Sequence, residues 1–235
     1  MPNRNVHSRR SSVYVYGYFN LNIGDDLFLK ILFERYPDTM FYVPIQDKDG
    51  YSELFSKYQN AVLIHPSTTY KILRKSVGIL FPSLYQKFKF KVDLISAKVN
   101  KFDNFISIGG SIFGEKNNNQ KDYRPDFYNV TEKINNRFFL GSNFGPFKTR
   151  EFLSYYENLF SKATDVCFRD KESFELFNHL QNVRMAPDIV FSLNTLPVKG
   201  IAALNKTVGF SIVDPDRKFQ SKECDRMSYI KNIHN

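Results

Sequence analysis

Short apolar runs alternate with stretches of helical periodicity along most of this chain. The apolar runs are rich in β-branched and aromatic residues, which is typical of strands: Val13 to Tyr18, Met40 to Val43, Ala61 to His65, Phe102 to Ile108, Arg137 to Leu140 and Val166 to Phe168. Helices are predicted between them at Leu27 to Arg35, Tyr51 to Tyr58 and Thr149 to Lys162, and again after Asp170. Strand, helix and strand in short units indicate an α/β, Rossmann-like parallel sheet with flanking helices.

The chain is expected to divide into three parts. Residues 1–12 are polar and basic and lack the apolar stretch of a signal peptide, so we expect a flexible N-terminus. Residues 13–194 are expected to form the Rossmann-like domain. Residues 195–235 begin with a linker and continue into a predicted strand and helix, but this segment is too short for a core of its own. We therefore expect it to be the truncated start of a second domain.

The composition is that of a globular protein, which we expect to lie in the cytoplasm. Of its 235 residues 42% are hydrophobic, which is ample for a buried core, and no apolar run approaches the roughly 18 residues needed to cross a bilayer. The two cysteines, Cys167 and Cys224, are too few for a disulfide framework, and the four histidines are scattered. We therefore expect reduced thiols and no metal site.

The net charge of +9 suits anionic partners. Basic residues are densest from Lys71 to Lys98, where the stretch Tyr85 to Lys91 alternates cations with aromatic residues. One interpretation is peripheral contact with the anionic inner face of a membrane, and the other is a solvated face whose aromatic side chains point into the core. The chain has no zinc-finger spacing, ribonucleoprotein aromatic signature or basic zipper, so nucleic acid is not an expected partner.

Five turns that follow predicted strands carry small, acidic or cationic residues: Gly17 to Asp25, Gly109-Gly110, Gly141 to Gly145, Arg169-Asp170 and Pro187-Asp188. In a parallel sheet with right-handed crossovers, the carboxyl ends of all strands lie at one edge. The five turns are therefore expected to line one crevice, where ligands bind in open α/β folds. Taken singly, each glycine is also explained by a tight turn or by helix packing.

Glycines and helix ends at this edge suit an anion. Glycine lets the backbone approach a ligand closely, and helix N-termini with unpaired N–H groups are expected after Gly24 and Ser111. The spacing of Gly17 and Gly24 matches neither the dinucleotide fingerprint nor a phosphate loop. Asp25 is a candidate for orienting a sugar hydroxyl or acting as a base, whereas Asp26 is expected to act only as a helix cap.

Arg169 is the leading candidate for ligand binding. It directly follows the predicted strand Val166 to Phe168 and precedes Asp170, which with Ser173 suits a helix start. An arginine there is held by the sheet edge, and its planar fork of donors can bind a carboxylate or phosphate bidentately. The other interpretation is an ion pair between Arg169 and a carboxylate that ties two loops together.

Taken together, these turns resemble the polysaccharide pyruvyl transferase family. The resemblance is carried by the order and spacing of Asn22-Ile23-Gly24-Asp25, Gly109-Gly110-Ser111-Ile112-Phe113, Gly141-Ser142-Asn143-Phe144-Gly145-Pro146, Phe168-Arg169-Asp170-Lys171-Glu172-Ser173 and Ala186-Pro187-Asp188. It covers the chain from Val13 to about Leu193. The turns and the resemblance together make these residues the candidates for substrate binding: Arg169, Asn22, Gly24, Asp25, Gly109, Gly110, Gly145 and Asp188.

The resemblance implies a fold similar to the N-terminal half of a two-domain glycosyltransferase B architecture, with the active site between the domains. It also implies a reaction in which the enolpyruvyl group of phosphoenolpyruvate is placed on two hydroxyls of a saccharide as a cyclic ketal, with release of phosphate. The acceptor would be a precursor of capsule, exopolysaccharide or another surface glycan, either free or lipid-linked. Phosphoenolpyruvate would be a co-substrate, with no separate cofactor, and Arg169 would supply a cation for it.

The resemblance also marks a departure. The family's second domain carries an Arg-x-His motif, whose arginine would bind phosphoenolpyruvate and whose histidine is the natural proton donor, and the sequence up to Asn235 has none. No residue is assigned the proton-donor role, and we expect either a fragment of a longer enzyme or a product that binds without turnover. The alternatives to a transferase are a binding or regulatory remnant and a nucleotide-sugar glycosyltransferase.

Overall fold

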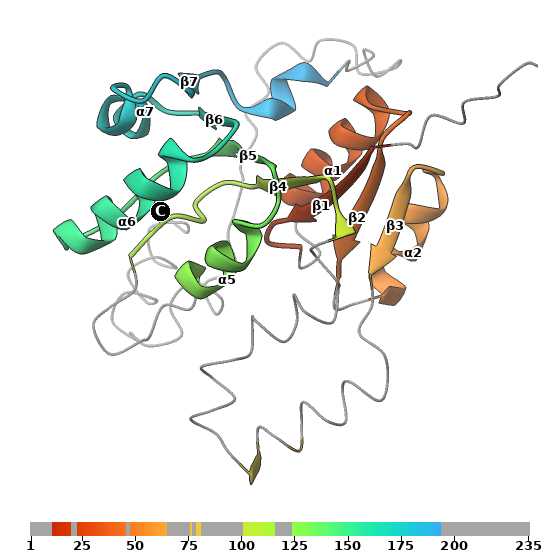
Figure 1. Ribbon diagram of the computed structural model, residues 1–235. Helices are drawn as coiled ribbons and strands as arrows, with labels where there is room; N and C mark the ends of the chain where they lie inside the picture. Colours follow the sequence, from red (N-terminus) through yellow and green to blue (C-terminus); the bar gives the residue numbers. More distant parts are fainter. Residues whose placement is uncertain are drawn as a thin grey trace, which may run out of the picture. The chain divides into compact units, whose positions relative to one another are not determined.

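Seven parallel strands form one sheet in the computed structural model of this protein (Figure 1), which describes residues 11–19, 23–45, 48–64, 76, 79–80, 101–115 and 124–193. The strands are β1 (Ser12–Tyr16), β2 (Met40–Pro44), β3 (Ala61–Ile64), β4 (Asn104–Ile108), β5 (Asn136–Ser142), β6 (Asp165–Phe168) and β7 (Val183–Met185). Their order is β3-β2-β1-β4-β5-β6-β7, and each neighbouring pair is parallel. The predicted α/β, Rossmann-like class is therefore confirmed.

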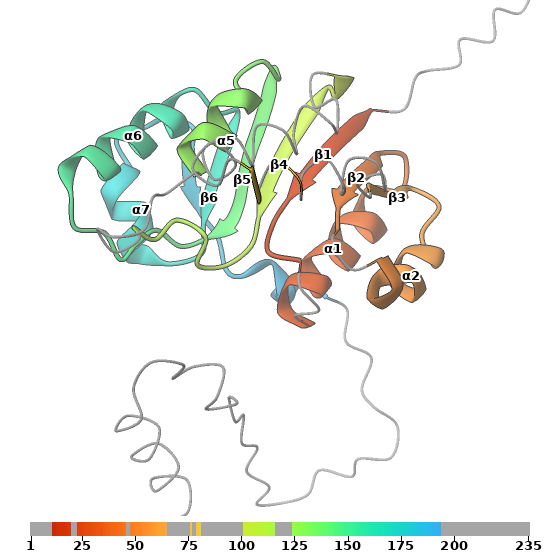
Figure 2. The same cartoon turned by 90° about the horizontal axis from the view of Figure 1, so that it is seen from below.

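Helices cover both faces of the sheet (Figure 2). The described helices are α1 (Ile23–Arg35), α2 (Lys48–Ser56), α5 (Arg124–Thr131), α6 (Arg150–Ser161), α7 (Lys171–Phe177) and the short 3-10 helix η2 (Ile189–Ser192). α1 and α2 pack on one face, and α5, α6 and α7 pack on the other. The helices around α1, α2, α6 and α7 were predicted from apolar periodicity, whereas α5 was not.

Alternation of side chains along the strands separates two hydrophobic clusters. Along β4, Phe105 belongs to the cluster under α5, α6 and α7, while Ile106 and Ile108 belong to the cluster under α1 and α2. Successive residues of a strand point to opposite faces, so a strand that is covered on both sides reads as a continuous apolar run. This is why β1 and β4 were evident in the sequence.

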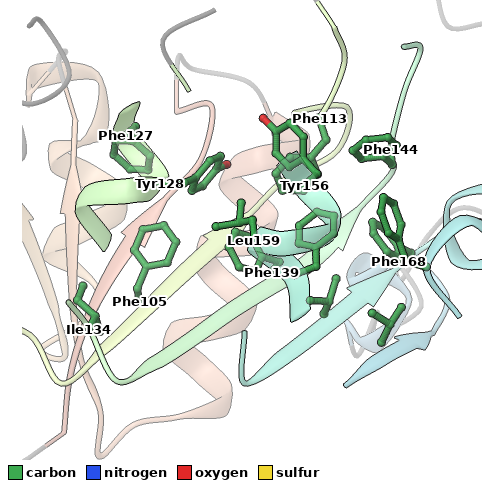
Figure 3. Close-up of a cluster of buried hydrophobic side chains, with 14 of the residues drawn as sticks. Phe105, Phe113, Phe127, Tyr128, Ile134, Phe139, Phe144, Tyr156, Leu159 and Phe168 are labelled. Carbon is green, nitrogen blue, oxygen red and sulfur yellow. The ribbon is translucent and has the colours of Figure 1, made fainter. Parts of the chain in front are cut away.

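The cluster under α5, α6 and α7 is dominated by aromatic rings (Figure 3). Phe139 of β5 packs edge-on against Tyr128 of α5 and Phe160 of α6, with ring centroids 5.6 Å and 5.3 Å away. All three side chains are fully buried. Edge-to-face pairs of this kind add about 0.5–1.5 kcal/mol beyond the area that they bury, so this half of the sheet has a rigid base.

Polar side chains define the ends of α6 and α7. Thr149 caps α6 by accepting from the Phe152 backbone N–H at 3.3 Å, and Asp170 caps α7 by accepting from the Ser173 N–H at 2.8 Å. At the other end of α6, the buried Arg137 donates to the carbonyl oxygen of Lys162 at 2.9 Å, and burial lowers its pKa. These contacts satisfy backbone groups at the helix ends that have no partner within the helix. The Asp170 cap also fixes the start of α7 at Lys171, two residues after Arg169.

One predicted helix start is wrong: no helix begins directly after Ser111, over the described residues 112–115. The segment to Glu115 is irregular, and Phe113 forms an isolated parallel bridge with Phe144. The guanidinium of Arg124 donates to the carbonyl oxygens of Ile112 and Gly114. Because Arg124 already binds these carbonyl groups and Phe113 is fully buried in the aromatic cluster, the segment does not form the hydrogen bonds of a helix.

The chain divides into two units, Met1–Leu193 and Asn194–Asn235, and every described residue lies in the first. Most of residues 1–12, the segment Lys71 to Lys98 apart from three of its residues, and residues 195–235 lie outside the described part of the chain. The predictions for these segments therefore stay predictions.

Within the described residues, no helix combines the length and the apolar character that a membrane span requires.

The buried hydroxyl of Ser173 connects the start of α7 to the turn that follows β5, and substituting it tests how much this contact stabilises the fold. Its Oγ accepts from the Phe144 N–H at 2.6 Å and donates to Asp170 at 2.8 Å, and its side chain is fully buried. We expect Ser173→Ala to lower the free energy of unfolding by about 1–3 kcal/mol, because the Phe144 N–H is left unsatisfied. Denaturant unfolding measures this value. Ser56→Ala, at an exposed hydroxyl, is the control and should change stability by less than about 0.5 kcal/mol; equal effects would contradict the prediction.

Candidate functional site

The strand order reverses between β1 and β4, which are neighbours in the sheet. Crevices at such a point, beyond the carboxyl ends of the strands, are where ligands bind in open α/β folds. Gly17 follows β1 and Gly109 follows β4 at this place. A Cβ added to Gly17 would lie 2.6 Å from the carbonyl oxygen of Ile108, so only glycine lets the two strand ends approach this closely.

Hydrogen bonds join the ends of β4, β5 and β6 in sequence. The Ser142 Oγ donates to the Gly109 carbonyl oxygen at 2.8 Å, and the Asn143 N–H donates to the Gly110 carbonyl oxygen at 3.2 Å. The Arg169 N–H in turn donates to the Ser142 carbonyl oxygen at 3.1 Å. The turns that follow these three strands were predicted to line one crevice. They are adjacent in space, and these hydrogen bonds fix their backbones relative to one another.

Arg169 lies at the carboxyl edge of the sheet, immediately after β6. Its Nη1 forms an ion pair with Asp188 Oδ2 at 2.7 Å, and its Nη2 donates to Asn143 Oδ1 at 3.1 Å. The side chains of Arg169 and Asp188 are 29% and 22% exposed. The ion pair that the sequence analysis gave as the alternative to a ligand clamp is thus present, and the side chain of Arg169 is still partly exposed.

Gly110 lies directly against the guanidinium of Arg169. A Cβ on Gly110 would be 2.8 Å from Nη2 and 3.3 Å from both Cζ and Nη1. These distances mean that the end of the guanidinium occupies the space where a side chain on Gly110 would begin. The glycine is therefore required for the close approach of Arg169 to the sheet edge.

Asp188 connects Arg169 to the opposite side of the sheet. Its Oδ1 accepts from the Val190 N–H at 3.1 Å and so caps η2, while its Oδ2 binds Arg169. η2 packs against α1, and Ile189 and Val190 join the hydrophobic cluster under α1 and α2. The segment after β7 thus returns across the sheet edge to α1, and Asp188 fixes that crossing.

The side chains of Asn143 and Ser111 also belong to this site, although neither side chain was among the predicted site residues. Asn143 Oδ1 accepts from the Ser111 Oγ at 3.2 Å as well as from Arg169. Ser111 directly follows Gly109 and Gly110, and Asn143 directly follows the last residue of β5, and these positions were the available signal. Their contact depends on the pairing of β4 with β5, which the local sequence does not state.

The first turn of α1 contributes the acidic side of the edge. Gly24 lies inside this turn, because α1 begins one residue earlier than Gly24. Asp25 is buried, at 8% exposure, and its Oδ1 would lie 3.5 Å from a Cβ on Gly109. Asp26 accepts from the Tyr51 hydroxyl at 2.7 Å, a contact to α2 beyond the helix-cap role expected for it. Asn22 lies outside the described residues.

Gly145 belongs to a separate hydrogen-bonded turn. Its N–H donates to the Phe113 carbonyl oxygen at 2.9 Å, and its φ of 105° is one that L side chains rarely adopt. Glu115 accepts from the Thr149 hydroxyl at 2.6 Å and from the Lys148 and Thr149 N–H groups, and these bonds hold its pKa below the ordinary value. The described contacts of Gly145 lead to the α6 cap and not to Arg169.

Groups for covalent or metal chemistry are sparse at this edge. Cys167 is buried in β6, and burial raises the pKa of its thiol, which disfavours the reactive thiolate. Over the described residues, no three His, Cys, Asp or Glu side chains come together as a set that could hold a metal ion. Among the described residues at this edge, the group best suited to bind a ligand is the guanidinium of Arg169, with the Asn143 amide, the Ser111 hydroxyl and the Asp188 carboxylate nearby.

The fold and this edge define an α/β, Rossmann-like protein with an arginine held at the carboxyl ends of its parallel strands. The sequence profile described as "Polysaccharide pyruvyl transferase" matches residues 22–233, nearly the whole chain. The protein belongs to the polysaccharide pyruvyl transferase family, as its motifs indicated. The motifs around Gly109, Asn143, Arg169 and Asp188 all lie within the matched range.

Two further comparisons add little. No curated protein matches the chain. Among solved structures, a short-chain dehydrogenase/reductase from Saccharomyces cerevisiae is similar at 14% sequence identity with a TM-score of 0.27. The alignment covers 73% of this chain and 60% of that one.

Gly17 and Gly110 make different close approaches, and alanine substitutions separate them. A Cβ on Gly17 meets a backbone carbonyl held in the sheet, so we expect Gly17→Ala to lower the free energy of unfolding by about 1–3 kcal/mol. A Cβ on Gly110 meets the flexible end of Arg169, which can move aside, and the lower entropy of the unfolded chain offsets the contact, so Gly110→Ala should change stability by less than about 1 kcal/mol.

Denaturant unfolding of the two variants at neutral pH checks this difference. If Gly110→Ala proves as destabilising as Gly17→Ala, the guanidinium is as rigid as the backbone, and our account of Gly110 is wrong.

Proposed function

We propose that this protein transfers the pyruvyl group of phosphoenolpyruvate to a saccharide as a cyclic ketal during the synthesis of a surface polysaccharide. Membership of the polysaccharide pyruvyl transferase family supports the reaction class. The observation that carries the proposal is Arg169, a partly exposed side chain at the carboxyl edge of the sheet, whose guanidinium is bound by Asp188 and Asn143. The proposed setting is the cytoplasm, at the inner face of the membrane where the acceptor is lipid-linked.

The reaction balances without an oxidant, a metal or a further cofactor. A proton adds to the methylene carbon of phosphoenolpyruvate, and the neighbouring carbon becomes cationic. Two hydroxyls of one sugar form bonds to that carbon while its bond to the phosphate oxygen breaks. Of the two hydroxyl protons released, one balances the proton taken up by the methylene carbon and the other leaves with phosphate.

The described residues suit the binding of the anion in this scheme. Phosphoenolpyruvate carries a carboxylate and a phosphate, and a guanidinium can donate two parallel hydrogen bonds to either. Electrostatic stabilisation of this kind acts where charge develops on the leaving group. Arg169 is proposed to bind one of the two anionic groups, and no described residue is assigned the transfer of the proton.

Phosphate release tests the proposed function. We expect the protein, incubated with phosphoenolpyruvate and a panel of lipid-linked and nucleotide-linked saccharides, to release phosphate with at least one acceptor. Mass spectrometry of that acceptor should show the added pyruvyl group. Absence of release across a broad panel would count against the transferase. Protection against heat by a nucleoside diphosphate, but not by phosphoenolpyruvate, would favour a nucleotide-sugar glycosyltransferase instead.

Arg169→Ala tests the role of the guanidinium. We expect the affinity for phosphoenolpyruvate to fall by about 1.5–3 kcal/mol, or roughly 10- to 150-fold, which is typical of a lost charged hydrogen bond. Isothermal titration calorimetry measures this change. Arg184→Ala is the matched control, because Arg184 forms an ion pair with Asp165, the first residue of β6, at the opposite end of that strand from Arg169. Unchanged affinity in a folded Arg169→Ala protein would leave Arg169 with a structural role alone.

A further inference from the structure

Asn143 makes a contact with Arg169 that only one orientation of its amide allows. A guanidinium carries donors and no acceptor, so the amide oxygen of Asn143, and not its nitrogen, must face Arg169. Oδ1 accepts from Arg169 Nη2 at 3.1 Å and from the Ser111 Oγ at 3.2 Å. The backbone of Asn143 is itself fixed, because its N–H donates to the Gly110 carbonyl oxygen at 3.2 Å.

The guanidinium is thus oriented from three directions. Asp188 binds Nη1, Asn143 binds Nη2, and Gly110 lies close to the end of the group that carries these two nitrogens. The first two contacts use two of the five N–H donors of an arginine. Without Asn143, the guanidinium plane can turn about its contact with Asp188. Gly110 cannot prevent this rotation, because it has no side chain that could hydrogen-bond to Arg169.

Bidentate recognition of a carboxylate or phosphate depends on the direction of that plane. We propose that Asn143 is a positioning residue that orients Arg169 for phosphoenolpyruvate. This inference rests on the proposed function and adds to it the residue that sets the geometry of the anion site. Asn143 acts through Arg169, and its contribution is to binding affinity.

The neutrality of Asn143 is part of the inference. The carboxylate of Asp188 already places one negative charge next to the guanidinium of Arg169. A second carboxylate would accept the same hydrogen bond more strongly, but it would also repel an anionic ligand. Asn143→Asp therefore separates two roles, because a hydrogen bond needed only for stability survives in that variant, whereas an anion site does not.

The experiment measures the dissociation constant of phosphoenolpyruvate by isothermal titration calorimetry on the full chain, with the stability of each variant measured by denaturant unfolding. We expect Asn143→Ala to weaken binding about 3- to 10-fold, as the loss of one hydrogen bond does. Asn143→Asp should be at least as stable as Asn143→Ala and should bind phosphoenolpyruvate more weakly than the unchanged protein does. The double variant Asn143→Ala with Arg169→Ala should match Arg169→Ala within about 2-fold, because the two residues act as one unit.

Asn136→Ala is the matched control. Asn136 begins β5, the strand that Asn143 follows, and its amide donates to the side chain of Asn104 at 3.0 Å, at the amino edge of the sheet. This variant should bind phosphoenolpyruvate as the unchanged protein does.

The outcomes separate this inference from the proposed function. If the unchanged protein does not bind phosphoenolpyruvate, the proposed function fails first. If it binds and Arg169→Ala weakens binding, the positioning role of Asn143 is overturned by any of three results: unchanged affinity in Asn143→Ala, full affinity in Asn143→Asp, or effects of Asn143→Ala and Arg169→Ala that add in the double variant.

Discussion

The parallel pairing of β4, β5 and β6 is the constraint on which the site depends. It brings Gly109 and Gly110, Ser142 and Asn143, and Arg169 into a row, and three hydrogen bonds lock that row. The register between β5 and β6 shifts between Leu140 and Ser142, at Gly141, whose φ is 69°. Bulges at strand ends redirect the residues that follow them, and this one lets Ser142 accept from the backbone of Arg169.

In the anion site that we propose, Arg169 has to meet two requirements that oppose each other. Its ion pair with Asp188 orients the guanidinium and ties the segment after β7 to the sheet, but it also offsets the positive charge that would attract an anion. Partial burial strengthens both effects, because charges interact more strongly away from water. A neutral amide as the second partner resolves part of this conflict, since it fixes direction without adding negative charge. Preorganisation of this kind lowers the entropic cost of ordering the side chain when a ligand binds.

The outcomes for particular elements show how far the sequence could lead. β1, β4 and β6 were predicted because strands covered on both faces are continuous apolar runs. α6 was predicted from its apolar periodicity and the start of α7 from Asp170 and Ser173, and the structure shows Thr149 and Asp170 as the N-caps of these helices. The helix expected after Ser111 is absent because Arg124, in an element that was not predicted, binds that segment's carbonyl groups.

The sequence by itself determined most of the strand and helix pattern and the placement of Arg169 at the end of a buried strand, because these depend on residues close together in the chain. The order and spacing of its motifs also indicated the family. The tertiary structure decided which turns meet. It paired Arg169 with Asp188 and Asn143, brought Ser111 to Asn143, and placed Gly145 in a turn whose described contacts lead to the α6 cap. Those contacts join residues that are far apart in the sequence, and only the order and register of the strands bring them together.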